Sequence, residues 1–152
     1  MSEVERIQQQ LKAALEGPAW SGPSVLEVLE GVSAARAAKR SIKGAHSIWE
    51  ITLHIAVWED VVRRRAMGEK FIPTDEQDWP AVKVKTPAAW QAVIRKLKAG
   101  NKALREVVGG FDDARLDQIL VPGGTASAYR TFHGAVQHDL YHAGQIAVLK
   151  KG

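Results

Sequence analysis

The chain has 152 residues, of which 45% are hydrophobic and 25% are charged. At about 150 residues per domain, this length and near-average composition predict one globular domain over residues 1–152 and exclude disordered, collagen-like and rod-like chains. There is no cysteine, which excludes disulfide frameworks, iron–sulfur clusters and cysteine nucleophiles. The net charge is only +4, and its clearest basic cluster, Arg63–Arg65, favours a solvated helix face over a phosphate-binding patch.

Signals for membrane insertion or export are missing from the sequence. No apolar run approaches the roughly 20 residues that span a bilayer. The polar start MSEVERIQQQ lacks the hydrophobic region of a signal peptide. We therefore expect no membrane association and a cytoplasmic location.

Helical periodicity begins near the N-terminus. Residues 4–15 repeat apolar side chains at four-residue steps, and the Gly-Pro pair at 17–18 ends the pattern. The repeating positions are Ile7, Leu11 and Leu15. Residues 18–45 are irregular, with two short helices predicted after the capping residues Ser24 and Ser33.

A second long helix is predicted over residues 47–67, ended by Gly68. Its expected buried side recurs at three- and four-residue steps, at Ile48, Ile51, Ile55, Trp58 and Val62. Residues 69–85 contain prolines and acids without a sustained period and predict a long loop. Long loops in compact domains often cover functional sites.

A third helix is predicted from Thr86, a capping residue followed by Pro87 at the first helical position, to the glycines at 109–110. Gly100 is a weak point in its middle.

The last helix is predicted over residues 128–150, after an irregular connection at 111–127. No segment except Ile119–Val121 looks like a strand, and one strand makes no sheet. The four long segments therefore predict an all-α fold, a four-helix bundle with short accessory helices in the long connections.

Histidine is the residue type with the most informative spacing. His138 and His142 lie four residues apart on the last helix, so both imidazoles project from one face and can converge on one metal ion. The zincin motif uses the same spacing, although its glutamate is absent here. Apolar residues above and below on that face, such as Ala135 and Leu149, indicate that it faces inward.

His54 lies at the edge of the buried stripe of the second long helix. Three inward-facing imidazoles need polar partners. Three neutral imidazoles around a divalent ion, with water in the open position, form a known catalytic arrangement. The spacing favours such a site at His54, His138 and His142, with satisfied core histidines as the open alternative.

Two segments resemble the signature helices of the DinB superfamily, whose members include YfiT-like metalloproteins. They are HSIWEITLHIAVWE at residues 46–59 and FHGAVQHDLYHAGQIAVLK at residues 132–150, about a fifth of the chain. The resemblance implies a four-helix bundle with a three-histidine metal centre near one end, often in a homodimer. It places the ligands on His54, His138 and His142, and it implies nickel, zinc or iron as the metal.

Two further residues are candidates for a catalytic role. Gln145 follows His142 by three residues, so it either hydrogen-bonds a metal-bound water or a ligand ring, or fills a buried polar gap. Glu50 lies one turn before His54 and either orients an imidazole, acts as a general base, or faces solvent.

Three other polar residues are expected outside the ligand set. His46 precedes the second long helix and reads as a capping or loop residue. His133 and Asp139 are turned about 140° and 100° from His138 around the helix, so a different neighbour is expected for each.

The function expected from residues and resemblance together is that of a cytoplasmic metal-dependent enzyme. Several relatives implied by the resemblance transfer groups to low-molecular-weight thiols, so a thiol-dependent S-transferase acting on a small electrophile is the favoured reaction. Because the chain has no cysteine, the sulfur must come from a co-substrate. The alternatives are a metal-dependent hydrolase and a non-catalytic, metal-containing dimeric binding or stress protein. Expected partners are a small-molecule substrate and a second copy of the chain, without nucleic acid or membrane.

Overall fold

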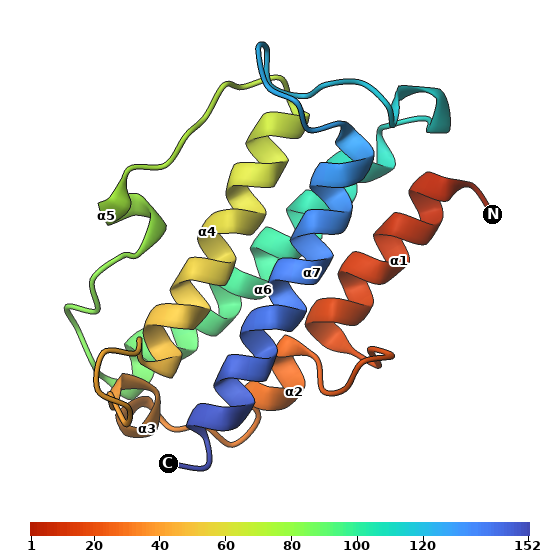
Figure 1. Ribbon diagram of the computed structural model, residues 1–152. Coiled ribbons are helices and arrows are strands. Elements are labelled where there is room, and N and C mark those ends of the chain that lie inside the picture. The colour runs from red at the N-terminus through yellow and green to blue at the C-terminus, as the bar shows by residue number, and fades with distance from the viewer.

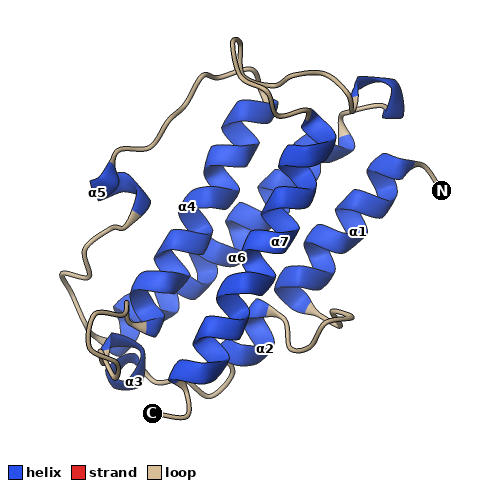
Figure 2. Ribbon diagram, viewed as in Figure 1, coloured by secondary structure: helices blue, strands red, loops and turns tan.

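The computed structural model describes residues 1–152, and its elements are helices without strands (Figures 1 and 2). The four long helices are α1 (Glu3–Glu16), α4 (Ile48–Ala66), α6 (Pro87–Gly109) and α7 (Ala128–Leu149). Helices α1 and α4 each contact both α6 and α7, so they occupy diagonal corners of a bundle. Helices α4 and α7 lie side by side and run in opposite directions (Figure 1). The predicted four-helix bundle is confirmed.

Short helices occupy the connections. α2 (Val25–Leu29) and α3 (Ala34–Ala38) follow the predicted capping serines. α5 (Asp75–Asp78) and the 3₁₀ helix η1 (Asp113–Arg115) interrupt segments predicted as irregular. The sequence does signal α5, because Thr74 and Gln77 form a capping box, in which each side chain accepts a hydrogen bond from the other residue's backbone N–H.

Capping residues determine where the helices begin. Each of the seven α-helices follows a serine or threonine whose side-chain oxygen accepts a backbone N–H from the first turn. For α4 and α7, the caps are Ser47 and Ser127. These two starts, together with the antiparallel packing, bring the middle of α4 beside the middle of α7.

The bundle core consists of two apolar clusters. One, around Trp90 and Ile146, includes residues of α2 and α3. The other, around Leu104 and Phe132, fills the opposite end. A layer of buried or half-buried polar side chains lies between them along α4, α6 and α7, consisting of His54, Glu59, Asn101, His138, Asp139 and His142. No helix combines the length and apolar character that a bilayer crossing requires.

Candidate metal centre

Three imidazoles from two antiparallel helices meet within this polar layer. His54 comes from α4, and His138 and His142 come from successive turns of α7. The Nε2 atom of His138 lies 3.1 Å from Nε2 of His54 and 3.1 Å from Nε2 of His142. His54 and His142 are each 6% exposed. The structure therefore brings together the three histidines that the sequence spacing selects, in a geometry that can hold a metal ion.

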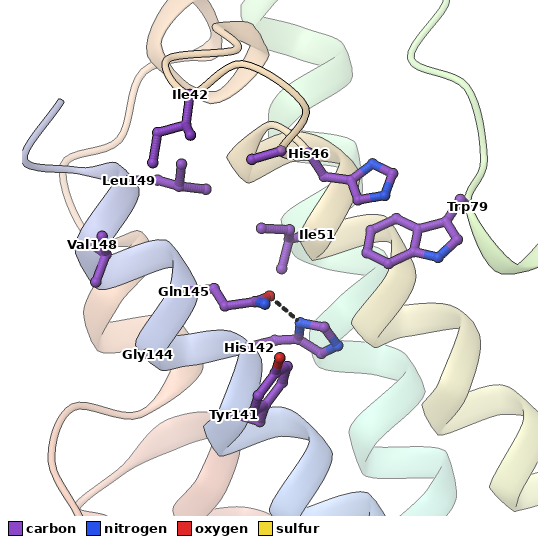
Figure 3. A pocket seen from close by; sticks show the side chains of 11 residues that line it. Ile42, His46, Ile51, Trp79, Tyr141, His142, Gly144, Gln145, Val148 and Leu149 are labelled. Carbon is purple, nitrogen blue, oxygen red and sulfur yellow. Dashed lines mark hydrogen bonds between the residues drawn. The ribbon is translucent and has the colours of Figure 1, made fainter.

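The opposite ring nitrogens of two of these histidines face hydrogen-bond acceptors. Nδ1 of His54 lies 2.8 Å from the backbone oxygen of Asp78 and 3.0 Å from its carboxylate Oδ1. Nδ1 of His142 lies 2.7 Å from Oε1 of Gln145 (Figure 3). Because these oxygens only accept, both Nδ1 atoms carry the proton and both Nε2 atoms present a lone pair.

The donor set fits a divalent transition metal. His138 can place at most one proton on Nε2, which serves one of its two neighbours, so the three rings cannot satisfy one another by hydrogen bonds alone. A cation accepts all three lone pairs at once. Ligand rings whose Nδ1–H is held by a carbonyl or carboxylate are typical of metal-binding histidines. Imidazole nitrogen suits zinc, nickel, copper and iron.

Burial keeps two of these rings in the form that binds metal. Burial, followed by the neighbouring His142 and His54, lowers the pKa of His138 to about 3. Burial also lowers the pKa of His142, and the hydrogen bond to Gln145 opposes that change only in part. Both rings are therefore neutral near pH 7, as metal ligation requires.

The long connection between α4 and α6 supplies the wall of the site. Trp79 stacks on His54 with ring centroids 3.8 Å apart and planes 4° apart, and on His46 at 3.6 Å and 5°. Asp78, the residue before it, also accepts a hydrogen bond from Nε1 of Trp58 at 2.6 Å. The segment predicted as a long loop therefore covers one side of the histidine cluster. Sequence reasoning did not assign Asp78 or Trp79, because nothing local signals which helix such a loop will touch.

Two cavities adjoin the histidines, and both are lined by Tyr141 and His142. The apolar cavity, of about 710 Å³, lies between α7, the start of α4 and Trp79 (Figure 3). Its lining includes Ile42, Ile51, Val148 and Leu149. The arginine cavity, of about 490 Å³, is lined by all three histidines and by Arg65 and Arg130. A reacting centre at the histidines is thus accessible from two differently lined spaces.

The two candidate catalytic residues have different positions. Gln145 lies in the site and holds a ligand ring, one of the two roles considered for it. Glu50 does not reach the three imidazoles by a hydrogen bond. Its carboxylate accepts the backbone N–H of Ser47 at 2.7 Å and pairs with Arg40, so it caps α4. Burial tends to raise the pKa of Glu50, but the bonds from Ser47 and Arg40 outweigh burial and lower it. This geometry does not support the general-base role considered for Glu50.

Asp139 meets a buried partner instead of the imidazoles. Its carboxyl interacts with that of Glu59 on α4, both residues are 1% exposed, and Asp139 Oδ2 and Glu59 Oε2 have no other hydrogen-bond partner. Burial raises the pKa of Asp139 to about 8 and, with the charge of Asp139 next in importance, raises that of Glu59 well above its usual range. Nδ2 of Asn101 donates to Glu59 at 2.8 Å. Glu59 was not predicted from the sequence, because it lies about 140° around α4 from His54 and therefore on another face.

His133 lies away from the cluster, with its ring 4.3 Å from that of Tyr129. This agrees with the expectation that it is not a ligand.

Comparisons with known proteins identify the family. A sequence model described as the DinB superfamily matches residues 20–146, which include all three clustered histidines. Comparison with curated proteins and with solved structures gave no match. Because the matched segment covers most of the chain and the structure is a helical bundle, the protein belongs to the DinB superfamily.

Proposed function

We propose that this protein is a metal-dependent enzyme that forms a bond between the sulfur of a low-molecular-weight thiol and a small electrophile, the thiol losing its proton and the electrophile its leaving group, with His54, His138 and His142 as the metal ligands. The observation that carries the proposal is the meeting of three Nε2 atoms at a place lined by two separate cavities. A transfer reaction has two substrates, and two cavities that share His142 and Tyr141 allow both to approach one centre.

A divalent ion at these ligands would supply Lewis-acid chemistry, lowering the pKa of a thiol so that its anion is available near neutral pH. The chain's own residues prepare the site for that chemistry. Asp78 and Gln145 fix the orientation of two ligand rings through their Nδ1–H groups. Trp79 covers one face of His54 and excludes water there. Tyr141, which is 66% exposed and lines both cavities, places a hydroxyl where a substrate can meet it.

The test is a conjugation assay. Metal-loaded protein is mixed with a generic electrophile such as 1-chloro-2,4-dinitrobenzene and with a panel of thiols that includes glutathione, cysteine and coenzyme A. We expect thiol consumption above the uncatalysed rate, lost in His138→Ala and kept in His133→Ala, which lies outside the cluster.

Protein that binds metal but consumes none of the thiols would contradict the proposal. Cleavage of an ester substrate without any thiol, lost in the same variant, would instead indicate the hydrolase alternative.

A further inference from the structure

We infer that the arginine cavity binds the carboxylate of an elongated thiol, held by Arg65 and Arg130 while the sulfur lies at the three histidines. The inference deepens the proposed function and rests on it for the identity of the reacting group. It concerns the end of the cavity away from the histidines, which the proposed chemistry does not use.

Both arginines lie on the same side of the histidine cluster. Arg65 follows His54 by 11 residues on α4, which is about 16 Å along the helix axis. Arg130 precedes His138 by eight residues on α7, which is about 12 Å. Because α4 and α7 run in opposite directions, both positions lie toward the end of the bundle where α4 finishes and α7 begins (Figure 1). Both side chains line one cavity with the histidines.

The charges of these two arginines have no carboxylate partner. Arg65 donates through Nε to the backbone oxygen of Phe71 at 3.1 Å, and its two terminal nitrogens make no hydrogen bond. The side chain of Arg130 makes neither a hydrogen bond nor an ion pair. The neighbouring Arg63 and Arg64, in contrast, pair with acidic side chains at 2.7 Å each. The cavity therefore contains guanidinium donors that remain available to a ligand.

The acidic group in the cavity wall does not neutralise them. Asp78 lines the cavity, but its carboxylate faces Nε1 of Trp58 and Nδ1 of His54. Arg65 lies over the ring of Trp58, with its guanidinium carbon 5.6 Å from the centroid, and both residues line the arginine cavity. Burial lowers the pKa of Arg65, so its charge is partly desolvated and an anion would stabilise it. Guanidinium groups bind carboxylates through paired N–H donors.

The distance between the two ends selects the length of the ligand. The guanidinium carbon of Arg65 lies 5.6 Å from the ring of Trp58, and that ring lies 5.8 Å from the ring of His138, so an indole ring separates the carboxylate-binding end of the cavity from the imidazoles. A thiol separated from its carboxylate by several bonds fits the spacing. The apolar cavity contains no lysine or arginine, so an uncharged electrophile fits there instead. The two cavities thus discriminate between the two substrates by charge.

The experiment compares acid and alcohol thiols of equal length by isothermal titration calorimetry on metal-loaded protein. 6-Mercaptohexanoate is expected to bind on the order of 10-fold more tightly than 6-mercaptohexanol, as charge-assisted hydrogen bonds predict. 3-Mercaptopropionate, which is too short to extend from the imidazoles past the indole ring of Trp58, is expected to show no such advantage over 3-mercaptopropanol. The double variant Arg65→Met, Arg130→Gln should lose the advantage of the long acid. Arg64→Met, which removes an adjacent arginine outside the cavity, should keep it.

Equal affinity for the long acid and alcohol in the wild type, no binding of the acid, or an unchanged preference in the double variant would overturn the inference. Failure of the proposed function looks different. In that case the acid binds with the arginine-dependent preference, but no thiol is transferred to any electrophile. Transfer that proceeds equally well with the acid and the alcohol leaves the proposed function standing and removes only the arginine site.

Discussion

The polar layer of the bundle has two halves that differ in how their hydrogen-bonding needs are met. The histidine half consists of His54, His138 and His142, and the carboxyl half consists of Glu59 and Asp139. Both halves use α4 and α7, but they lie on different faces of these helices. The histidine half borders two cavities, whereas the carboxyl half is enclosed and also bonds to Asn101 of α6.

The two halves differ in how far their own protons can satisfy their hydrogen-bonding groups. A proton shared between the two carboxyls would satisfy the carboxyl half, because burial raises both pKa values and Glu59 Oε2 and Asp139 Oδ2 have no other hydrogen-bond partner. The histidine half cannot be satisfied in this way, since two rings already direct their protons outward to Asp78 and Gln145. Nε2 of His138 can donate to only one of the two lone pairs that face it, so a cation can satisfy all three rings where a proton cannot, and we expect the two halves to respond oppositely to metal and to mutation.

The largest expected effect is on metal affinity. His138→Ala removes the central Nε2 donor, so metal affinity should fall by more than about 100-fold, because the groups that merely orient ligand rings contribute about 10- to 100-fold. Titration calorimetry with Zn²⁺ measures the loss, and far-ultraviolet circular dichroism should show unchanged helix content. His133→Ala is the control and should bind as the wild type does. Equal affinity in the two variants would remove His138 from the ligand set.

The carboxyl half should control the pH dependence of stability. Glu59 and Asp139 have raised pKa values in the folded protein, so the folded state binds more protons and their contribution to the unfolding free energy falls as pH rises above about 4.5 toward 8. Glu59→Gln replaces a titratable carboxyl with an amide that can still hydrogen-bond its neighbours, so the variant's stability should decline less steeply with pH. Urea unfolding of chelator-treated protein between pH 5 and pH 8 measures the slope for both proteins.

Histidines with lowered pKa values act in the opposite direction, because they stabilise the folded state less as pH falls through the unfolded value near 6.5. They are present in both proteins, so the difference between wild type and Glu59→Gln isolates the carboxyl pair. Parallel stability curves for the two proteins would mean that the pair does not retain a proton.

A smaller loss of metal affinity is expected when the hydrogen-bond partner of a proposed ligand ring is removed. Gln145→Leu removes the acceptor for Nδ1–H of His142 and should weaken metal binding by about 10- to 100-fold. Gln145→Glu restores an acceptor and should recover most of the affinity. If Gln145→Leu and Gln145→Glu bind metal equally, the hydrogen bond does not orient the ring.

The smallest expected effect distinguishes capping from chemistry at Glu50. Glu50→Ala removes one arm of the capping box of α4 and the pairing with Arg40, which should lower the unfolding free energy by about 0.5–2 kcal/mol. Metal affinity should stay within about 2-fold of the wild type, since Glu50 makes no hydrogen bond to the ligands. Thermal unfolding and metal titration of the same sample check both statements. A large loss of metal affinity would restore the catalytic role first considered for this residue.

Local patterns predicted the parts of the fold that local chemistry determines. Capping serines and threonines set the helix starts, and the four-residue spacing of His138 and His142 selected one helix face. The capping box at Thr74 was available in the sequence but overlooked. Asp78 and Trp79 could not be predicted, because a loop residue reaches His54 only through the path of the whole connection. The metal's identity and a homodimer stay predictions.

The central claim is that three imidazoles bind one cation. X-ray absorption spectroscopy of protein loaded with one equivalent of Zn²⁺ counts the imidazole ligands directly. We predict three nitrogen ligands at about 2.0–2.1 Å with the multiple-scattering pattern of imidazole, and one fewer imidazole in His142→Ala. A first coordination sphere made only of oxygen, or one that is identical in wild type and His142→Ala, would contradict the account.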